Sequence, residues 1–367
     1  MKQIIQSVID NLNASHLKGK TITLGFDGCA DTICRVVKKY NEDQLELFET
    51  ISHFSEYLAQ KSGISCSIEL EEQTTKAGGN GPIFATAVSE YGINTSVVGL
   101  FGKSQCNEIF DELKSRCKMY SYSKNAMAIV LEFNDGKIML SPRVRINGDV
   151  WEQIVAAVGE DNMQSVFADV DMLGLVNWSE LEYCTTIWKR LFEYLSKTPD
   201  KSKQIIVDLA DCSRKNVRSI TEMLDLLEQF TYIRKVILSL NESEAMELYR
   251  VLCNKSHSGE DYEKLGFTLA DIIKVDRLVL HSRKCCYSYE AGRISSMPTQ
   301  FNETPKLQTG GGDNFNAGYA LGCILDFPPE YCNVLGNAVS SYYISYGKSP
   351  GLKELKRHLE QWYLSLE

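Results

Sequence analysis

Short apolar runs alternate with helical patterns along most of the chain, and this alternation limits the possible folds more than any other feature of the sequence. The runs are hydrophobic on both faces, as expected for strands that helices cover on both sides. Such an alternation predicts βαβ units and a three-layer α/β/α domain with a mostly parallel central sheet over residues 1–367. The predicted strands cover residues 21–26, 95–100, 172–176, 204–209, 235–240 and 278–281, and the predicted helices cover 83–91, 107–114, 185–195, 217–230 and 243–251.

Two regions interrupt this alternation with strands that have one polar face. Residues 33–39 and 65–72 show this pattern, and residues 127–133 and 138–141 flank Asn134-Asp135-Gly136-Lys137, a strong hairpin signal. We expect these segments to form a small separate sheet whose hydrophobic face needs a partner, either a substrate site or a second subunit. Its strands are expected to be inserted at about 32–40, 64–74 and 126–142.

A glycine-rich stretch near the C-terminus carries the strongest functional signal. Gly310-Gly311-Gly312-Asp313 is followed directly by a helical pattern, so the glycines would lie at a helix N-terminus. Unpaired N–H groups and the positive end of the helix dipole favour an anion there. Asp313 would lie in the first turn beside that anion, which suits a general base in phosphoryl transfer. A glycine-rich turn capped by an acidic residue is the simpler structural interpretation.

The charge and the cysteines argue against several other classes of protein. The net charge of −9 disfavours a nucleic-acid or anionic-membrane surface. No apolar stretch approaches the roughly 20 residues that span a bilayer, and the N-terminus lacks the apolar core of a signal peptide, so we expect a cytoplasmic protein. The 12 cysteines include no Cys-x-x-Cys pair, and the five histidines do not cluster near them, which argues against a zinc site.

Two further motifs place polar groups where a sugar could bind. Gly78 and Gly79 would let a hydroxylated substrate approach the backbone, and Asn80 offers both a donor and an acceptor for its hydroxyls. Asp27 and Asp31 follow the first predicted strand, at the end where ligands bind in open α/β sheets. The spacing alone does not choose between these two aspartates. A strand-to-helix turn and an Asx turn explain the same residues without a ligand.

A fourth motif, Asn241-Glu242-Ser243-Glu244, directly follows the predicted strand at 235–240. A carboxylate at this strand end could organise magnesium through water molecules, while Asn241 contacts phosphate. Asparagine at a helix N-cap with glutamate three residues later is also a capping box. The two interpretations are compatible.

Taken in their order along the chain, these motifs resemble those of the ribokinase (PfkB carbohydrate kinase) family. The resemblance spans about residues 25–351. Its most specific element, Thr309-Gly-Gly-Gly-Asp-Asn-Phe-Asn-Ala-Gly318, is similar to the family's C-terminal signature. Residues 78–92 resemble its N-terminal signature, and Asn241-x-x-Glu244 resembles its Asn-x-x-Glu motif. The resemblance implies a ribokinase-like fold in which the small sheet is a lid that covers the sugar and often dimerises.

The resemblance also implies an activity and a set of site residues. Members use ATP and Mg²⁺ to phosphorylate a hydroxyl, usually of a sugar or nucleoside. By motif, Asp313 is the base, and the amides of Gly310, Gly311, Gly312 and Asp313 form the anion hole. The other implied roles are acceptor binding by Asp31, Gly78, Gly79 and Asn80, magnesium binding through water by Glu244, and nucleotide binding by Asn241, Ser282, Asn337 and Arg214.

Four features depart from the family pattern. One is the segment Asp27-Gly-Cys-Ala-Asp31, which is spaced differently from the start of ribokinase-type sequences. Gly311 stands where the family often has alanine, and Ile83 stands where it commonly has asparagine, so Asn80 would replace one sugar contact. His281-Ser282-Arg283 replaces the family's Thr-x-Gly nucleotide loop, although Ser282 could still donate a hydroxyl contact. These departures argue against assuming ribose or fructose as the acceptor.

Alternatives stay open beside an ATP- and Mg-dependent kinase that acts on an alcohol group of a sugar or sugar derivative. A nucleoside kinase needs an apolar cleft, which Phe26, Phe84 and Phe101 could line, although core packing explains them equally well. A non-catalytic ligand-binding homologue is supported only by the altered loop at 281–283. A dinucleotide-binding dehydrogenase would need a Gly-x-Gly-x-x-Gly fingerprint, which is absent after the first strand. The one-sided lid strands also predict a homodimer through the lid.

Overall fold

Two β-sheets of unequal size organise the protein. The computed structural model describes residues 1–41, 44–103, 106–257, 261–300, 302, 306–307 and 309–366. Within these residues, nine strands form the large sheet in the order β14-β13-β12-β11-β10-β9-β1-β5-β6. The pairs β12–β13 and β13–β14 are antiparallel, and the other neighbouring strands are parallel. These strands are β1 Thr21–Gly25, β5 Asn94–Gly99, β6 Lys118–Ser121, β9 Met172–Leu175, β10 Gln204–Asp208, β11 Lys235–Asn241, β12 Arg277–His281, β13 Cys285–Glu290 and β14 Arg293–Pro298.

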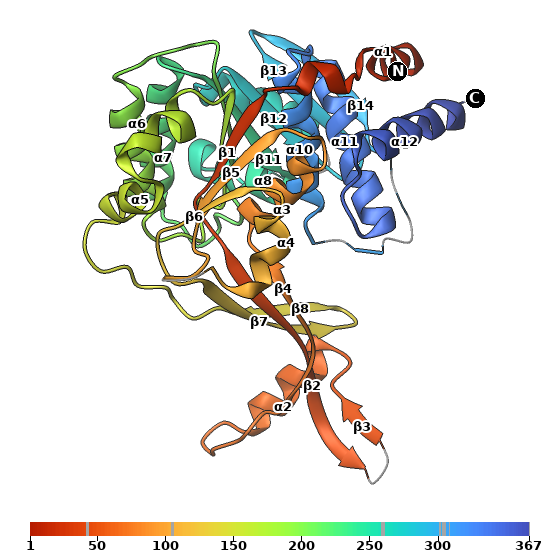
Figure 1. The fold of residues 1–367 in the computed structure, drawn as a ribbon. Coiled ribbons are helices and arrows are strands. Elements are labelled where there is room, and N and C mark those ends of the chain that lie inside the picture. Colours follow the sequence, from red (N-terminus) through yellow and green to blue (C-terminus); the bar gives the residue numbers. More distant parts are fainter. Residues whose placement is uncertain are drawn as a thin grey trace.

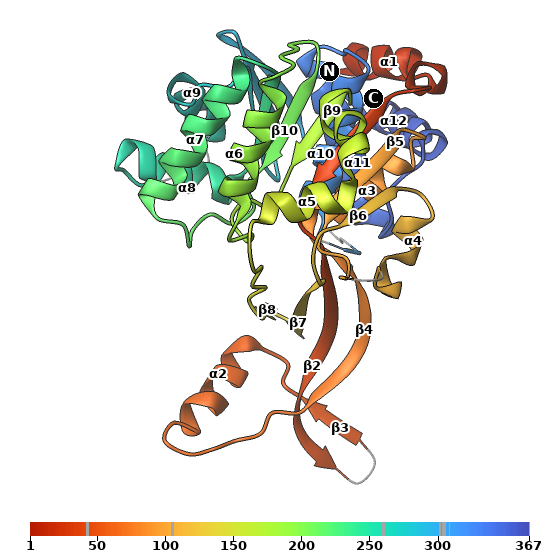
Figure 2. The ribbon, with the colours of Figure 1, turned by 60° about the vertical axis from the view of Figure 1, so that its left-hand side comes forward.

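Helices cover both faces of the large sheet because successive strand residues point to opposite sides (Figures 1 and 2). On β10, Ile205 and Val207 belong to one hydrophobic cluster, whereas Ile206 between them belongs to the other. The first cluster is completed by α5 Val150–Val158, α6 Cys184–Leu195, α7 Val217–Thr231, α8 Glu242–Cys253 and α9 Tyr262–Ile272. The second is completed by α1 Lys2–Asn11, α3 Asn80–Ser89, α4 Asp111–Lys114, α10 Gly311–Ile324, α11 Pro329–Tyr346 and α12 Leu352–Ser365.

The three-layer α/β/α architecture and the mostly parallel sheet are therefore confirmed. All six strands predicted for the large sheet are present as β1, β5, β9, β10, β11 and β12. The helix predicted at 107–114 is instead a short 3₁₀ turn, Glu108–Phe110, followed by α4. Among the described residues, no helix is both long enough and apolar enough to cross a membrane.

The small sheet extends away from the three layers (Figures 1 and 2). Its strands run in the order β3-β2-β7-β8, and β4, which lies off this path, pairs antiparallel with β2. One face packs against α2 Ile51–Gln60 through a distal core of Cys34, Val36, Phe48, Phe54, Leu131 and Phe133. The strands are β2 Cys29–Asn41, β3 Gln44–Leu47, β4 Leu70–Gly78, β7 Ala126–Phe133 and β8 Gly136–Leu140.

One strand of the small sheet lies later in the sequence than predicted. The pattern favoured a strand at 65–72, whereas β4 begins at Leu70 and continues to Gly78. Most of its side chains are exposed on both faces, so hydrophobic alternation carries little information about its ends. Its position is instead set by antiparallel backbone pairing with β2, from Val36 opposite Leu70 to Cys29 opposite Gly78. This pairing extends the strand directly to the start of α3.

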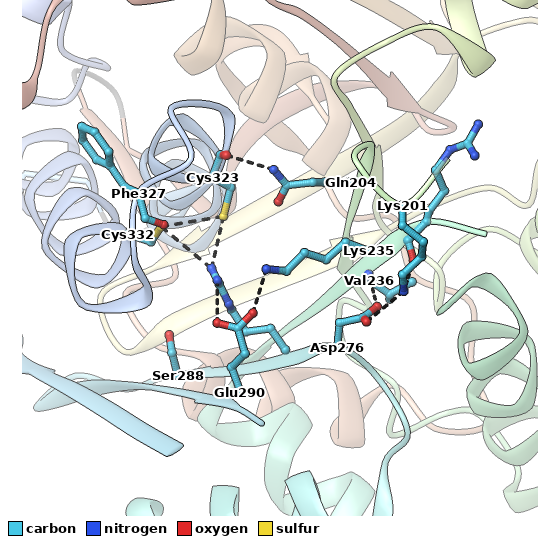
Figure 3. A network of polar contacts seen from close by, with 12 residues as sticks. Lys201, Gln204, Lys235, Val236, Asp276, Ser288, Glu290, Cys323, Phe327 and Cys332 are labelled. Atoms are coloured by element: carbon cyan, nitrogen blue, oxygen red, sulfur yellow. Dashed lines mark hydrogen bonds and ion pairs between the residues drawn. The ribbon is translucent and has the colours of Figure 1, made fainter. Parts of the chain in front are cut away.

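A network of polar contacts that includes Lys235, Glu290 and Cys323 ties the last strands of the large sheet to α10 (Figure 3). The Arg277 guanidinium on β12 pairs with Glu290 at 2.8 Å and contacts the Cys323 sulfur at 3.6 Å. Lys235 on β11 also pairs with Glu290, at 2.7 Å. The side chain of Arg277 is only 5% exposed, so its charge depends on these partners. The network anchors the C-terminal half of the helix that carries Asp313 at its other end.

Glu290→Ala is expected to destabilise the protein by about 3 kcal/mol, because it leaves the buried Arg277 charge without its carboxylate. Urea unfolding followed by circular dichroism measures the change. Glu193→Ala is the matched control, since Glu193 pairs with Arg190 on the surface of α6 and should contribute less than about 1 kcal/mol. Equal effects of the two substitutions would show that the Arg277 network does not stabilise the fold.

Candidate active site

A sharp turn before α10 gathers backbone amides at one point. Gly310 has a φ of +90°, a left-handed conformation that favours glycine, and it caps the N-terminus of α10. A Cβ atom at Gly310 would also lie 2.9 Å from the Tyr343 hydroxyl oxygen, so the position has little room for a side chain. The first N–H groups of a helix have no partner within it. The amides of the predicted anion hole therefore lie together at a helix N-terminus.

Asp313 lies in the first turn of α10 among other carboxylates. Its side chain is buried, and this burial raises its pKa well above the usual range, with further increases from the negative charges of Asp208 and Asp27. Asp208 ends β10 and accepts hydrogen bonds from the side-chain amide of Asn316 at 2.6 Å and the backbone N–H of Ala210 at 3.0 Å. The site is therefore strongly acidic and favours a cation or a shared proton.

Asn241 and Glu244 form the predicted capping box at the start of α8. The backbone N–H of Glu244 donates to the Asn241 side chain at 3.0 Å, and the Asn241 N–H donates back to the Glu244 carboxylate at 2.9 Å. Glu244 is buried, and burial raises its pKa well above the usual range, followed by the charges of Asp208 and Asp313. The cap thus holds Glu244 facing the same acidic site.

A cavity of about 580 Å³ opens beside the glycine turn. Gly311 and Gly312 line it together with Asn241, Ser282 and Asn337. Four segments that are distant in sequence therefore meet at the cavity: the glycine turn, the start of α8, the loop at 281–283 and α11. The Asn337 amide donates to the carbonyls of Met297 and Pro298, both at 3.2 Å, which fixes α11 against the end of β14. The wall also contains His281, whose ring stacks on Phe315 with centroids 4.5 Å apart. The cavity therefore combines amides, hydroxyl and amide side chains with a flat aromatic surface.

Arg214 is not among the residues that line this cavity, and its predicted contact with a phosphate of the nucleotide stays a prediction. Its guanidinium pairs with Glu180, and 73% of its side chain is exposed. Asp208, which precedes it in the same segment, is the residue that enters the site. The reason is position: Asp208 is the last residue of β10, whereas Arg214 lies beyond the turn that follows the strand.

The predicted acceptor-binding residues lie where β1, β2, β4 and α3 meet. The Asp27 carboxylate accepts hydrogen bonds from the Gly81 N–H at 2.9 Å and from the Asn177 side chain at 2.7 Å. Asp31 is different, because its Oδ1 is buried and has no hydrogen-bond partner among the described residues. A Cβ atom at Gly78 would lie 2.1 Å from the Asp31 Oδ2, and one at Gly79 would lie 2.7 Å from the Asp27 Oδ2. The glycines thus make room for both carboxylates.

Asp27→Asn is expected to change how stability depends on pH. Burial raises the pKa of Asp27 to about 6, against 3.8 in water, so the carboxyl is favourable when protonated and costs stability when ionised. The contribution of the Asp27 carboxyl to the free energy of unfolding of the wild type therefore falls as the pH rises from about 4 through 6, by on the order of 3 kcal/mol. Asparagine has no such charge, and Asn177 can turn its unpartnered Oδ1 towards the new amide. Urea unfolding at several pH values should show that the free energy of unfolding of the variant rises relative to that of the wild type across this range. Parallel pH profiles of the two proteins would contradict the prediction.

Several site residues were missed by the sequence reasoning. Asp208 could have been found, because it lies near the end of the buried strand predicted at 204–209, at the edge where ligands bind. Asn177 also follows a strand, and its φ of +59° marks a special backbone conformation that no local pattern reveals. Lys137 was identified only as part of a hairpin turn, but its ammonium donates to the hydroxyl of Thr309, beside the glycine turn. Such a contact depends on the tertiary fold.

The comparisons with known structures agree with this architecture. Adenosine kinase from Sinorhizobium meliloti is similar with a TM-score of 0.65 and 17% identity, over 94% of this chain and 99% of that one. Ribokinase from Arabidopsis thaliana, complexed with ribose and ATP, is similar with a TM-score of 0.62 and 16% identity, over 93% and 98%. The fold is thus that of the ribokinase-like kinases.

The sequence comparisons define the family more narrowly. A family model described as prokaryotic ketohexokinase matches residues 2–362. A ketohexokinase from Haloferax volcanii is 24% identical over 345 residues, which cover 93% of this chain and 91% of that protein. The chain belongs to the prokaryotic ketohexokinase family and is a carbohydrate kinase. The predicted class of enzyme is therefore confirmed.

Proposed function

We propose that this kinase transfers the γ-phosphate of ATP to an alcohol group of a ketohexose, with Asp313 as the base and the 310–313 amides as the anion hole. The observation that carries the proposal is the position of Asp313 at the N-terminus of α10. Gly311 and Gly312 beside it line the cavity, and the charge of Asp27 on the acceptor side acts on it. The ketohexose is suggested by the family and by the relative from Haloferax volcanii.

The proposed reaction is a direct phosphoryl transfer. The alcohol oxygen of the sugar attacks the γ-phosphorus, the bond from that phosphorus to the oxygen bridging it to ADP breaks, and the alcohol proton passes to Asp313. Charge on the transferred group is stabilised by preorganised amides, which need no reorientation during the reaction. A raised pKa makes Asp313 a stronger base once it is ionised.

Magnesium is the cation proposed for the acidic site. Glu244, Asp208 and Asp313 repel one another in a buried site, and the nearby Asn316 Oδ1 has no partner among the described residues. Within the described part of the chain, no three histidine, cysteine or acidic side chains are grouped closely enough to bind a metal directly. This arrangement suits magnesium, which keeps several of its water ligands. The ion would neutralise charge on the β- and γ-phosphates.

The proposed sugar contact is Asp31 rather than Asp27. Both oxygens of Asp27 are already used by the protein, whereas the buried Oδ1 of Asp31 lacks a partner among the described residues. Asp31 lies on β2, so the small sheet would cover the acceptor as a lid. The homodimer through these strands stays a prediction, which light scattering can test.

The proposed function is tested by ADP release from ATP and Mg²⁺ with a panel of ketohexoses, aldoses, polyols and nucleosides. We expect one or more ketohexoses to raise turnover well above the ATPase background. Preferential turnover with nucleosides would replace the ketohexose assignment by the nucleoside kinase alternative. Silence across the panel together with no calorimetric heat from ATP and Mg²⁺ would favour a non-catalytic ligand-binding protein.

A further inference from the structure

A lysine of the small sheet reaches the glycine turn of the active site. Lys137 is the second residue of β8, which begins at Gly136, and its ammonium donates a hydrogen bond to the hydroxyl of Thr309. Thr309 immediately precedes Gly310, the cap of α10. Although the two residues are far apart in sequence, the fold places a positive charge from the small sheet next to the proposed anion hole.

The strand register shows which charged groups surround this lysine. Lys137 lies opposite Glu132 of β7, and Asp31 of β2 lies opposite Lys76 of β4. Partial desolvation lowers the pKa of Lys137, and the charge of Lys76 lowers it further, while Glu132 and Asp31 raise it. Lys137 thus interacts electrostatically with Asp31, the proposed sugar ligand, and donates a hydrogen bond to Thr309 beside the glycine turn.

We propose that Lys137 is a catalytic residue that binds the transferred phosphoryl group from the side of the small sheet. The proposal rests on the proposed function. An ammonium has three donors, and the bond to Thr309 uses one of them, so the others can reach an anion beside the turn. A charge-assisted bond to a phosphoryl oxygen is stronger than a bond to a neutral hydroxyl, so the anion would outcompete Thr309.

The arrangement gives the transferred group ligands on two sides. The amides at the N-terminus of α10 approach it from the large domain, and Lys137 approaches it from β8. Negative charge in phosphoryl transfer is spread over three equatorial oxygens, which amides on one side cannot all reach. Lys137 would also lie near the acceptor, because Asp31 is close enough to affect its pKa.

The first test is steady-state kinetics with the sugar that the wild type phosphorylates. Lys137→Met is expected to lower kcat by about 10²-fold, as for loss of one preorganised donor, with KM for ATP and sugar within a few-fold. Lys137→Arg, which keeps the charge, should restore part of this loss. Lys38→Met is the matched control, since Lys38 lies on the same sheet and pairs with Glu46 at the surface. Wild-type kcat in Lys137→Met, or a higher sugar KM with unchanged kcat, would overturn the proposal.

The second test does not depend on turnover. ADP with Mg²⁺ and aluminium fluoride mimics the transferred phosphoryl group, and calorimetry should show that Lys137→Met binds it about 10²-fold more weakly than the wild type while binding ADP alone equally well. Equal affinity of both proteins for the aluminium fluoride complex would overturn the role of Lys137. This result stands even if the panel of sugars yields no substrate, so the two proposals can fail separately.

The pH profile separates a catalytic charge from a structural one. The wild-type kcat/KM should fall at alkaline pH as Lys137 loses its proton, and Lys137→Arg should remove this fall because arginine stays charged. Lys76→Met removes a neighbouring positive charge and should move the fall to higher pH. An alkaline limb that is identical in all three proteins would contradict the proposal.

Discussion

Asp313→Asn is expected to lower kcat by about 10³-fold or more while the protein stays folded, because the amide cannot accept the alcohol proton. Asparagine has nearly the same shape and removes a buried carboxylate whose pKa is raised by burial and by Asp208 and Asp27. Stability at neutral pH should therefore be unchanged or higher. ADP release with a saturating ketohexose and thermal unfolding measure the two effects.

The matched control lies at the other end of the same helix. Asp326 follows α10 and has a φ of +56°, a conformation that asparagine also tolerates. Asp326→Asn should leave kcat at the wild-type level. Wild-type turnover in Asp313→Asn would refute the assignment of the base, and a similar loss in both variants would indicate that changes anywhere on α10 impair the enzyme.

Asp31→Ala is expected to lower kcat/KM for the sugar by about 10²-fold, mainly through a higher KM. The buried Oδ1 of Asp31 lacks a partner among the described residues, and a hydrogen bond from a hydroxyl to a charged acceptor contributes roughly 1.5–3 kcal/mol. Initial rates over a range of sugar concentrations measure the change. KM for ATP should stay within a few-fold, because Asp31 does not line the cavity that contains Asn241, Ser282 and Asn337, the residues predicted to bind the nucleotide.

Thr32→Ala provides the control for this substitution. Thr32 is adjacent on β2, and its hydroxyl contacts Thr75 of β4 at 3.2 Å instead of entering the acceptor site. Its kinetic constants should match those of the wild type. An unchanged sugar KM in Asp31→Ala would move the acceptor-binding role to other residues, with Asn80 the next to be substituted.

The large sheet was predictable because each of its central strands is buried on both faces. Ile205, Ile206 and Val207 show the reason: adjacent apolar residues are required when each points into a different core. The glycine turn and the capping box were equally accessible, since both act through residues next to each other in sequence. Local chemistry therefore predicted the helix start at Gly310–Asp313 and the capping box of Asn241 and Glu244, while the catalytic roles of these residues stay predictions.

The features that local sequence patterns did not predict depend on contacts between distant parts of the chain. β4 is held by backbone pairing with β2, which its exposed polar side chains do not encode. Arg214 was predicted to contact phosphate from its charge, and only the tertiary structure shows that it lies beyond the end of β10 and pairs with Glu180. Lys137 acquires its significance only because the fold brings β8 to Thr309.

The distal core beneath α2 has a mechanical consequence for the enzyme. Phe48, Phe54 and Phe133 pack together where α2 covers one face of the small sheet, so the sheet should behave as a stiff plate. Asp31 and Lys137 belong to that plate, and they would approach or leave the glycine turn together as it tilts. Sugar binding by Asp31 and stabilisation of the transferred phosphoryl group by Lys137 would then depend on the same rigid sheet. Substitutions that loosen the distal core would weaken both functions together.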